Sequence, residues 1–270
     1  MDAFVRFHQF VRAHRSKPGE ATTHTCMGRT LRGRYSFSAA VAEEFYTLHS
    51  AASVAAVAAM GDGDDRHEDA PAFVEQPTMY GPARIDVDFR FAASLEPERA
   101  YSRATLEHVA RVYRTVFEKY LDAPPAALEA YVFERPRPYS NRAGGVSDGF
   151  HVLFPRVVSS KDFFLFARDK VVALLAKERA FAGLGIINSV DNAVDKAVVD
   201  TNGWFVYGSG KPGKVPYAWT WSYDGRELVA AEAPGSPAEH AVFAKLLSIR
   251  RHDDATITKS QVEYPSLTGR

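Results

Sequence analysis

Apolar residues recur along the chain with the two spacings that distinguish helices from strands. Residues 83–91 alternate strictly between apolar and charged side chains, which predicts a strand that buries Ile85, Val87 and Phe89. A polar, glycine-containing loop is expected over residues 136–149. Apolar residues at helical spacing predict helices over 1–15, 35–60, 101–121, 161–179 and 239–250. Further strands are expected over 127–134, 150–154 (ending at Pro155), 203–207 and 217–223, with a hairpin turn at Asp224–Gly225.

Composition excludes several classes of protein. The chain has 270 residues, of which 46% are hydrophobic and 24% charged, as in ordinary globular proteins. The single cysteine, Cys26, excludes an intramolecular disulfide framework and a zinc site held by several thiolates. No run approaches roughly 18 apolar residues, and the first residues do not resemble a secretory signal. We therefore expect an intracellular protein without a membrane segment.

Charge is balanced overall but segregated along the chain. The sequence has 33 Lys and Arg against 33 Asp and Glu, which excludes a polycation but not a local basic groove. Residues 1–35 carry an excess of basic residues, whereas residues 61–69 form an acidic cluster expected to be a solvated loop. The basic residues are Arg6, Arg12, Arg15, Lys17, Arg29, Arg32 and Arg34. This segregation is compatible with a basic groove for nucleic acid.

Two carboxylates stand out on the alternating strand. Asp86 and Asp88 are two positions apart, so their side chains point to the same face, with Cα atoms about 6.5–7 Å apart. Such a pair repels unless it binds hard divalent cations, and two-metal phosphoryl transfer uses an arrangement of this kind. The alternative is a solvent-facing strand whose acids pair with Arg84 and Arg90.

Three further segments carry candidate chemistry. His151 begins a predicted strand and could bind a triphosphate or a metal-bound carboxylate, although a structural histidine would also fit. A third carboxylate could come from any of three acids between residues 189 and 204. Lys211 lies in the loop 208–214, GSGKPGK, which departs from an ATPase P-loop at Pro212 and Val215 but could still contact phosphate. The three acids are Asp191, Asp195 and Asp200.

Taken in order, these segments resemble the archaeo-eukaryotic primase superfamily. They are most similar to the branch that forms the N-terminal domain of primase-helicases of large nucleocytoplasmic DNA viruses, and the resemblance covers roughly residues 20–225. The strand-borne acid pair matches DVD, the histidine motif matches GFHVLFP, and the third motif matches DKAVVDTNGWFVYGSGKP, which selects Asp195 among the three acids. Many members carry Ser two residues before the histidine; here Gly149 stands there, and Ser147 could replace it.

The resemblance implies an α+β primase fold, in which an RRM-like mixed sheet packs against a second α/β lobe. It implies an N-terminal lobe over 1–80, a catalytic core over 81–232, and a C-terminal helix with a polar tail over 233–270. The implied enzyme is a nucleotidyltransferase that binds two Mg²⁺ or Mn²⁺ ions, without zinc, through Asp86, Asp88 and Asp195. His151 would contact the triphosphate, and the other implied nucleotide-binding residues are Ser147, Arg142 and Lys211.

The implied function is primer synthesis in DNA replication, as a primase or primase-polymerase. Its partners would be a single-stranded DNA template, nucleoside triphosphates and a helicase domain or subunit, with no membrane. Trp219 or Tyr217 could stack on template bases, although packing within a hairpin explains such residues equally well. A viral protein of this kind would act in the host cytoplasm or nucleus. Two alternatives remain, namely a catalytically inactive nucleic-acid-binding module and a two-metal nuclease.

Overall fold

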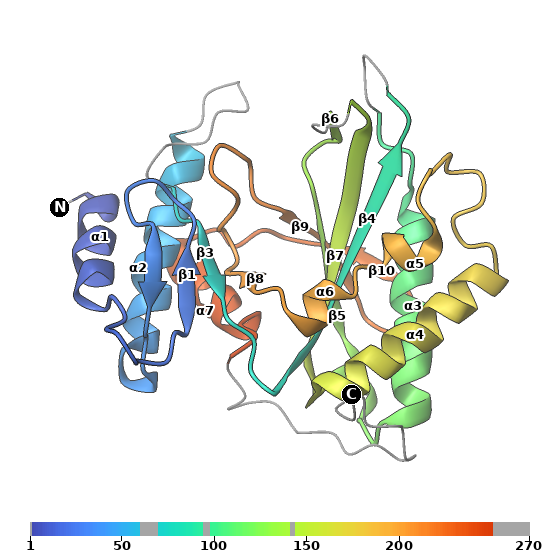
Figure 1. Ribbon diagram of the computed structural model, residues 1–270, viewed down its shortest axis with the longest axis horizontal. Helices are drawn as coiled ribbons and strands as arrows, with labels where there is room; N and C mark the ends of the chain where they lie inside the picture. Colours follow the sequence, from blue (N-terminus) through green and yellow to red (C-terminus); the bar gives the residue numbers. More distant parts are fainter. Residues whose placement is uncertain (1, 60–69, 94–97, 141–143, 251–270) are drawn as a thin grey trace. The chain divides into compact units, whose positions relative to one another are not determined.

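The computed structural model describes residues 2–59, 70–93, 98–140 and 144–250, and these residues form two compact units. Unit 1 takes its described residues from the ranges 1–78, 203–217 and 233–251. Unit 2 takes its described residues from 79–202 and 218–232. Figure 1 shows the elements of both units. Residues 203–217, which we placed with the core 81–232, therefore belong with the N-terminal residues.

Unit 1 is a four-stranded antiparallel sheet with three helices. The strand order is β2-β1-β3-β8. Its elements are α1 (Ala3–Ala13), β1 (His24–Cys26), β2 (Gly33–Tyr35), α2 (Ala39–Ala58), β3 (Phe73–Glu75), β8 (Trp204–Phe205) and α7 (Pro237–Leu246). Helix α2 packs against both α1 and α7. An aromatic cluster that includes Phe7 of α1, Phe45 of α2 and Phe73 of β3 forms the core.

A buried carboxylate links the middle of unit 1 to its C-terminal segment. Glu75 on β3 is 1% exposed and accepts hydrogen bonds from the Tyr46 hydroxyl (2.8 Å), the Ser248 hydroxyl (2.6 Å) and the Ile249 backbone N–H (2.7 Å). Burial by itself would raise the pKa of Glu75, but contact with His24 and the hydrogen bonds lower it below the ordinary value. The buried negative charge is thus compensated by several donors.

Unit 2 is a six-stranded antiparallel sheet with helices. The order is β10-β9-β5-β7-β4, and β6 pairs with β7. Its elements are β4 (Tyr80–Phe91), α3 (Arg103–Tyr120), the 3₁₀ turn η1 (Pro125–Leu128), β5 (Ala130–Glu134), β6 (Tyr139–Ser140), β7 (Val146–Ser160), α4 (Lys161–Lys177), α5 (Val190–Ala193), α6 (Ala197–Asp200), β9 (Ala218–Tyr223) and β10 (Leu228–Ala230). Strand β7 lies between β4 and β5, the two strands that α3 connects, in a split β-α-β arrangement.

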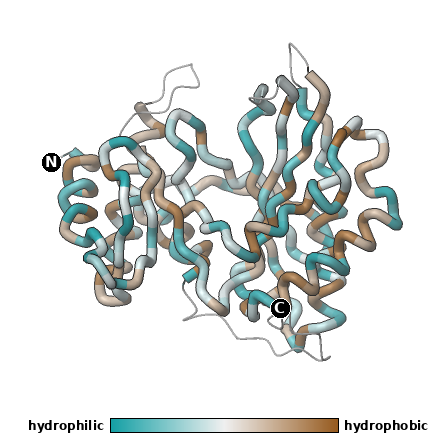
Figure 2. Tube along the Cα trace, in the orientation of Figure 1, coloured by the Kyte–Doolittle hydropathy of each residue, from teal (hydrophilic) through white to brown (hydrophobic). Residues whose placement is uncertain are grey.

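Alternation along β4 shows which face of the sheet of unit 2 the helices cover. Val87 on β4 lies opposite Phe150 on β7, and both are fully buried on the face that α3 and α4 cover. Phe117 of α3, for example, contacts Phe154 of β7 with ring centroids 5.2 Å apart. In Figure 2 the helices of this unit carry alternating hydrophobic and hydrophilic residues, as one buried face requires. The charged positions of β4 lie on the opposite face.

The structure confirms the α+β class and corrects several expected details. All paired strands of the described residues are antiparallel, where we expected a mixed sheet, because β7 separates the parallel pair β4 and β5. Strand β7 continues beyond Pro155, since a register shift opposite Pro82 and Ala83 accommodates the missing N–H. The loop expected over 136–149 contains β6 and the start of β7.

Other boundaries also differ. The region 35–60 starts with Tyr35 in β2, and its helix begins only at Ala39. The strand expected over 127–134 begins at Ala130, after η1. The strand over 203–207 is reduced to two residues, and the last helix ends at Leu246 instead of 250. The hairpin at Asp224–Gly225 is confirmed, since β9 and β10 pair directly on either side of it.

Two further observations concern the chain as a whole. None of the helices in the described ranges combines the length and the apolar character needed to cross a membrane. The acidic cluster at 61–69, Arg142 and the polar tail after residue 250 lie outside the described residues.

Candidate active site

Asp86 and Asp88 project from β4 on the face opposite α3 and α4. Their apolar neighbours Ile85, Val87 and Phe89 are at most 2% exposed, so the middle of the strand is fixed in the core. The side chains of Asp86 and Asp88 remain 18% and 39% exposed. The predicted acidic pair therefore sits on a rigid strand and is still accessible.

His151 lies directly beside Asp86. The register of β4 and β7 places the two residues opposite each other, and the His151 Nε2 atom is 3.4 Å from Asp86 Oδ1. Neither strand predicts this contact by itself, because it depends on how the two strands are aligned. A protonated His151 would neutralise part of the carboxylate charge.

Asp195 approaches Asp86 from the other edge of β4. Val194 forms an isolated antiparallel bridge with Val87, and the Asp195 N–H donates to the Asp86 carbonyl at 2.9 Å. This register places Asp195 opposite Asp86, and opposite residues of an antiparallel pair have Cβ atoms about 4.5–5.5 Å apart on one face. The structure therefore brings Asp86, His151 and Asp195 into one row across three neighbouring segments.

Two buried arginines hold the segment that carries Asp195. Arg168 on α4 donates to the Val194 carbonyl through Nε (3.1 Å) and Nη2 (2.6 Å), and also to the Asp191 carboxylate and carbonyl. Arg84 on β4 donates to the carbonyls of Val198 (2.8 Å) and Val199 (3.3 Å). These contacts fix the residue directly before Asp195 and the backbone three to four residues after it.

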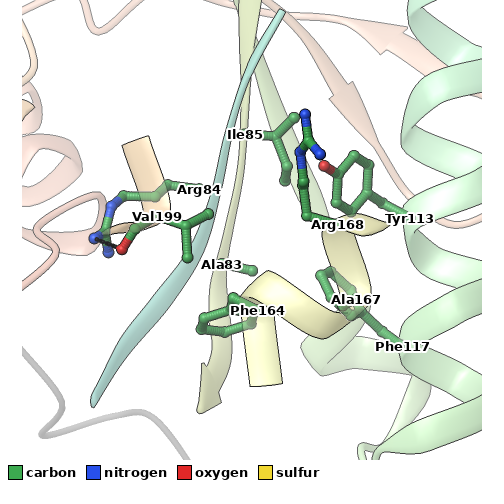
Figure 3. Close-up of a pocket in the computed structure, with 9 residues that line it drawn as sticks. All are labelled: Ala83, Arg84, Ile85, Tyr113, Phe117, Phe164, Ala167, Arg168 and Val199. Carbon is green, nitrogen blue, oxygen red and sulfur yellow. Dashed lines mark hydrogen bonds between the residues drawn. The ribbon is translucent and has the colours of Figure 1, made fainter. Parts of the chain in front are cut away.

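Figure 3 shows the residues that line a small pocket around β4: Arg168 lies on the side of Tyr113 of α3, and Arg84 lies on the side of Val199 of α6. The pocket has a volume of about 10 Å³, room for roughly one water molecule and not for a nucleotide. Burial by itself would lower the pKa of Arg168. Its hydrogen bonds to Asp191 and Asp169 raise the pKa by a larger amount, so the net shift is upward. Arg168 therefore stays charged as an anchor.

A second charged cluster fixes the strand ends near Asp88. Asp148 on β7 is fully buried and pairs with Arg99, whose Nε lies 3.1 Å from Asp148 Oδ2. Arg99 also contacts Glu134 on β5 at 2.8 Å and donates to the Arg135 carbonyl. Burial opposes the charge of Arg99, but these carboxylates raise its pKa overall. Strands β5 and β7 are thus tied together next to the candidate site.

Asp88 itself pairs with an arginine that the sequence did not reveal. Arg135, the residue after β5, places Nη2 2.8 Å from Asp88 Oδ1. We considered Arg84 and Arg90 as partners of the acids because they share the strand. The actual partner is 47 residues away in sequence, and no local pattern marks it.

The remaining predicted residues are more dispersed. Ser147 lies on β7 opposite Arg90, four residues from His151, which corresponds to about 13 Å along a strand. Lys211 is exposed in unit 1, in the loop after β8. That loop is anchored by the buried Ser209, whose Oγ accepts from the Phe73 N–H at 3.0 Å and lies 2.8 Å from His49 Nε2. Within unit 2, therefore, the structure unites four of the predicted residues: Asp86, Asp88, His151 and Asp195.

The candidate site carries three carboxylates but no closed cluster of ligands. In the described part of the chain, no three His, Cys, Asp or Glu side chains converge as metal ligands would. Asp88 contacts Arg135, and Asp195 Oδ1 accepts from the Ala197 N–H at 2.8 Å. The three carboxylates supply oxygen atoms, which is the type of ligand that Mg²⁺ and Mn²⁺ prefer.

Comparison with known proteins assigns the chain to a family. A family model described as the C962R protein N-terminal AEP domain, where AEP denotes archaeo-eukaryotic primase, matches residues 23–223. This chain belongs to that family. The matched range includes Asp86, Asp88, His151 and Asp195, and the resemblance inferred from the sequence is confirmed. At the level of the superfamily, the chain is primase-like.

One curated relative extends this result. The AEP domain is 27% identical over 210 residues to a protein of Acanthamoeba polyphaga mimivirus named "Putative helicase L207/L206". The match covers 76% of this chain and 20% of the mimivirus protein. The chain thus spans about one fifth of the length of that relative, whose name refers to a helicase.

Proposed function

We propose that this AEP domain is a DNA-dependent nucleotidyltransferase that synthesises primers on single-stranded DNA during replication. The observation that supports the proposal is the row formed by His151, Asp86 and Asp195, with Asp88 two positions along β4. A chain of this family with its acids and histidine on one face of a rigid sheet has the groups that nucleotidyl transfer requires.

Asp86, Asp88 and Asp195 would hold two Mg²⁺ or Mn²⁺ ions. When bound, these ions would lower the pKa of the attacking 3′-hydroxyl and neutralise the triphosphate and the leaving pyrophosphate. His151 would donate a hydrogen bond to the triphosphate from Nε2, the atom that now faces Asp86. Arg168 and Arg84 would keep Asp195 in place through the backbone on either side of it.

The proposed template is single-stranded DNA, bound mainly through its phosphates. In unit 1, Arg29, Arg32 and Arg34 are exposed around β1 and β2 and supply positive charge. Lys211 lies in the same unit and would add to it. Trp219 is partly buried against Tyr131, with ring centroids 5.6 Å apart, which favours a packing role over base stacking. Because the mimivirus relative is named as a helicase, we propose that the domain acts beside a helicase domain or subunit.

The primary experiment measures template-dependent incorporation of nucleotides on single-stranded DNA with Mg²⁺ or Mn²⁺. Asp86→Asn and Asp88→Asn are expected to abolish product and pyrophosphate release. Asp122→Asn, which removes the charge of an exposed aspartate after α3, is expected to retain both and serves as the control. Equal product from the wild type and the Asp86→Asn variant would refute the proposed site. Omitting the primer separates primases from polymerases.

A second candidate function rests on the Arg135–Asp88 ion pair. An arginine fixed on a metal-binding carboxylate could replace the cation permanently, as in a catalytically inactive nucleic-acid-binding module. That reading predicts single-stranded DNA binding without any metal dependence and no nucleotide incorporation by the wild type. Binding that strengthens with Mn²⁺ and disappears with Asp88→Asn would contradict it.

A further inference from the structure

The side chain of Arg135 is largely buried, although it forms an ion pair with the more exposed carboxylate of Asp88. Its guanidinium contacts Asp88, and its charged end also lies over the ring of Tyr139, 4.8 Å from the centroid. The Arg135 side chain is only 16% exposed. Arg99 donates to its backbone carbonyl, so the base of the side chain is fixed.

The strand register explains how Arg135 reaches Asp88. Glu134 lies opposite Phe150 on β7, so the next residue, Arg135, comes opposite Gly149, which in turn lies opposite Asp88 on β4. A Cβ atom at Gly149 would lie 3.1 Å from Asp88 Oδ1 and 2.1 Å from the Val87 carbonyl oxygen. The glycine therefore leaves a passage across β7 through which the guanidinium meets the carboxylate.

We propose that Arg135 is a nucleotide-binding residue that exchanges partners when the site is loaded. This inference rests on the proposed function, since it assigns Asp88 to a divalent cation. Without the cation, Arg135 neutralises Asp88. When the cation binds Asp88, the guanidinium turns to the phosphate oxygens of the incoming nucleotide.

Three features favour this exchange over a purely structural ion pair. A guanidinium held on Asp88 Oδ1 and a divalent cation on the same carboxylate repel each other, so Arg135 opposes cation binding as long as it stays on Asp88. Arginine presents its N–H groups as a planar fork that suits two phosphate oxygens as well as a carboxylate. Once the Arg135 guanidinium has left Asp88, it would lie beside the row of His151 and Asp86, where the triphosphate is proposed to bind. One side chain thus serves the empty and the loaded site.

The exchange predicts opposite effects on two binding constants, both measured without catalysis. In Arg135→Gln, Mn²⁺ binding without nucleotide should strengthen by about 2- to 5-fold, because a competing partly exposed ion pair is lost. Binding of a non-hydrolysable nucleoside triphosphate with Mn²⁺ present should weaken by about 10- to 100-fold, because a charge-assisted hydrogen bond is lost. Mn²⁺ binding is followed by the electron paramagnetic resonance of the free ion, and nucleotide binding by calorimetry.

Matched variants separate the possible results. Arg156→Gln removes an arginine of β7 that is paired with a carboxylate, Glu129, at 2.9 Å, and should change neither constant. Arg135→Lys keeps the charge but not the fork, so nucleotide binding should weaken while Mn²⁺ binding stays near wild type; this variant also decides the question if Arg135→Gln does not fold. Wild-type constants in both Arg135 variants would overturn this inference while leaving the proposed function intact. Mn²⁺ binding that is insensitive to Asp88→Asn would overturn both.

Discussion

Arg168 offers the sharpest test of how the fold positions Asp195. Replacing it with methionine keeps most of the side-chain length but removes the guanidinium. The hydrogen bonds lost to the segment that carries Asp195 reach the Val194 carbonyl and both the carbonyl and the carboxylate of Asp191; a contact with Asp169 within α4 is lost as well. Arg168 is 4% exposed, so water cannot replace these donors without opening the structure.

The free energy lost in Arg168→Met is the difference between two opposing contributions. Hydrogen bonds from a charged donor contribute about 1.5–3 kcal/mol each, whereas removing a buried charge recovers several kcal/mol of desolvation cost. The net loss for three acceptors is then about 2–4 kcal/mol in the free energy that holds residues 190–199 on β4. At about 1.4 kcal/mol per factor of ten, the segment should open roughly 30- to 1,000-fold more often.

Amide hydrogen exchange of Asp195 reports this opening directly, because its N–H donates to the Asp86 carbonyl. We expect its protection to fall by that factor in Arg168→Met and to change by less than ~5-fold in Arg156→Met, whose pair with Glu129 is exposed. Amides in the middle of β7 monitor the whole of unit 2. Unchanged protection of Asp195, or an equal loss throughout β7, would refute the proposed anchoring.

Three more predictions follow from the structure. Gly149→Ala should cost about 1–3 kcal/mol or more in a denaturant titration, since its Cβ would lie 2.1 Å from the Val87 carbonyl oxygen; an equally stable variant would contradict this. Burial lowers the pKa of His240 to about 4, so its contribution to stability is present above pH ~6.5 and is lost as the pH falls toward 4; thermal unfolding from pH 7 to 4 should show a drop that His240→Asn reduces. Arg32→Ala with Arg34→Ala should weaken single-stranded DNA binding and lower its logarithmic salt dependence by about 1.4, and an unchanged slope would place the template elsewhere.

Part of unit 2 could be predicted because strand β4, at the end of the sheet order, buries one face more than the other. The alternation from Ile85 to Phe89 reports the contact with α3 and α4, so both the strand and the orientation of Asp86 and Asp88 follow from sequence. The extension of β7 past Pro155 did not follow, because a bulge is defined by the partner strand. The short helices α5 and α6 have only four residues each, too few for periodicity to appear.

The site was predictable only in part, because several of its contacts join residues that are far apart in the sequence. Asp86 and Asp88 are neighbours on one strand, so their common face can be derived from spacing. His151 was a candidate from its own strand, and the spacing within the third family motif selected Asp195 among three acids. Arg135 and Arg168 act on residues 47 and 26 positions away, and only the folded register brings those partners together.

The path of the chain through unit 1 determines when the contacts of this unit can form during synthesis. Strand β3 gains its neighbour β8 only after residue 204 has been made, and Glu75 gains the donors Ser248 and Ile249 later still. At roughly 5–20 residues per second, a ribosome needs about 10–35 seconds to extend the chain from residue 75 to residue 248. The strands and helices around Asp86 are complete well before then. The first part of the chain to leave the ribosome therefore completes its contacts last, and until then Glu75 has its early partners His24 and Tyr46 but lacks two of its donors.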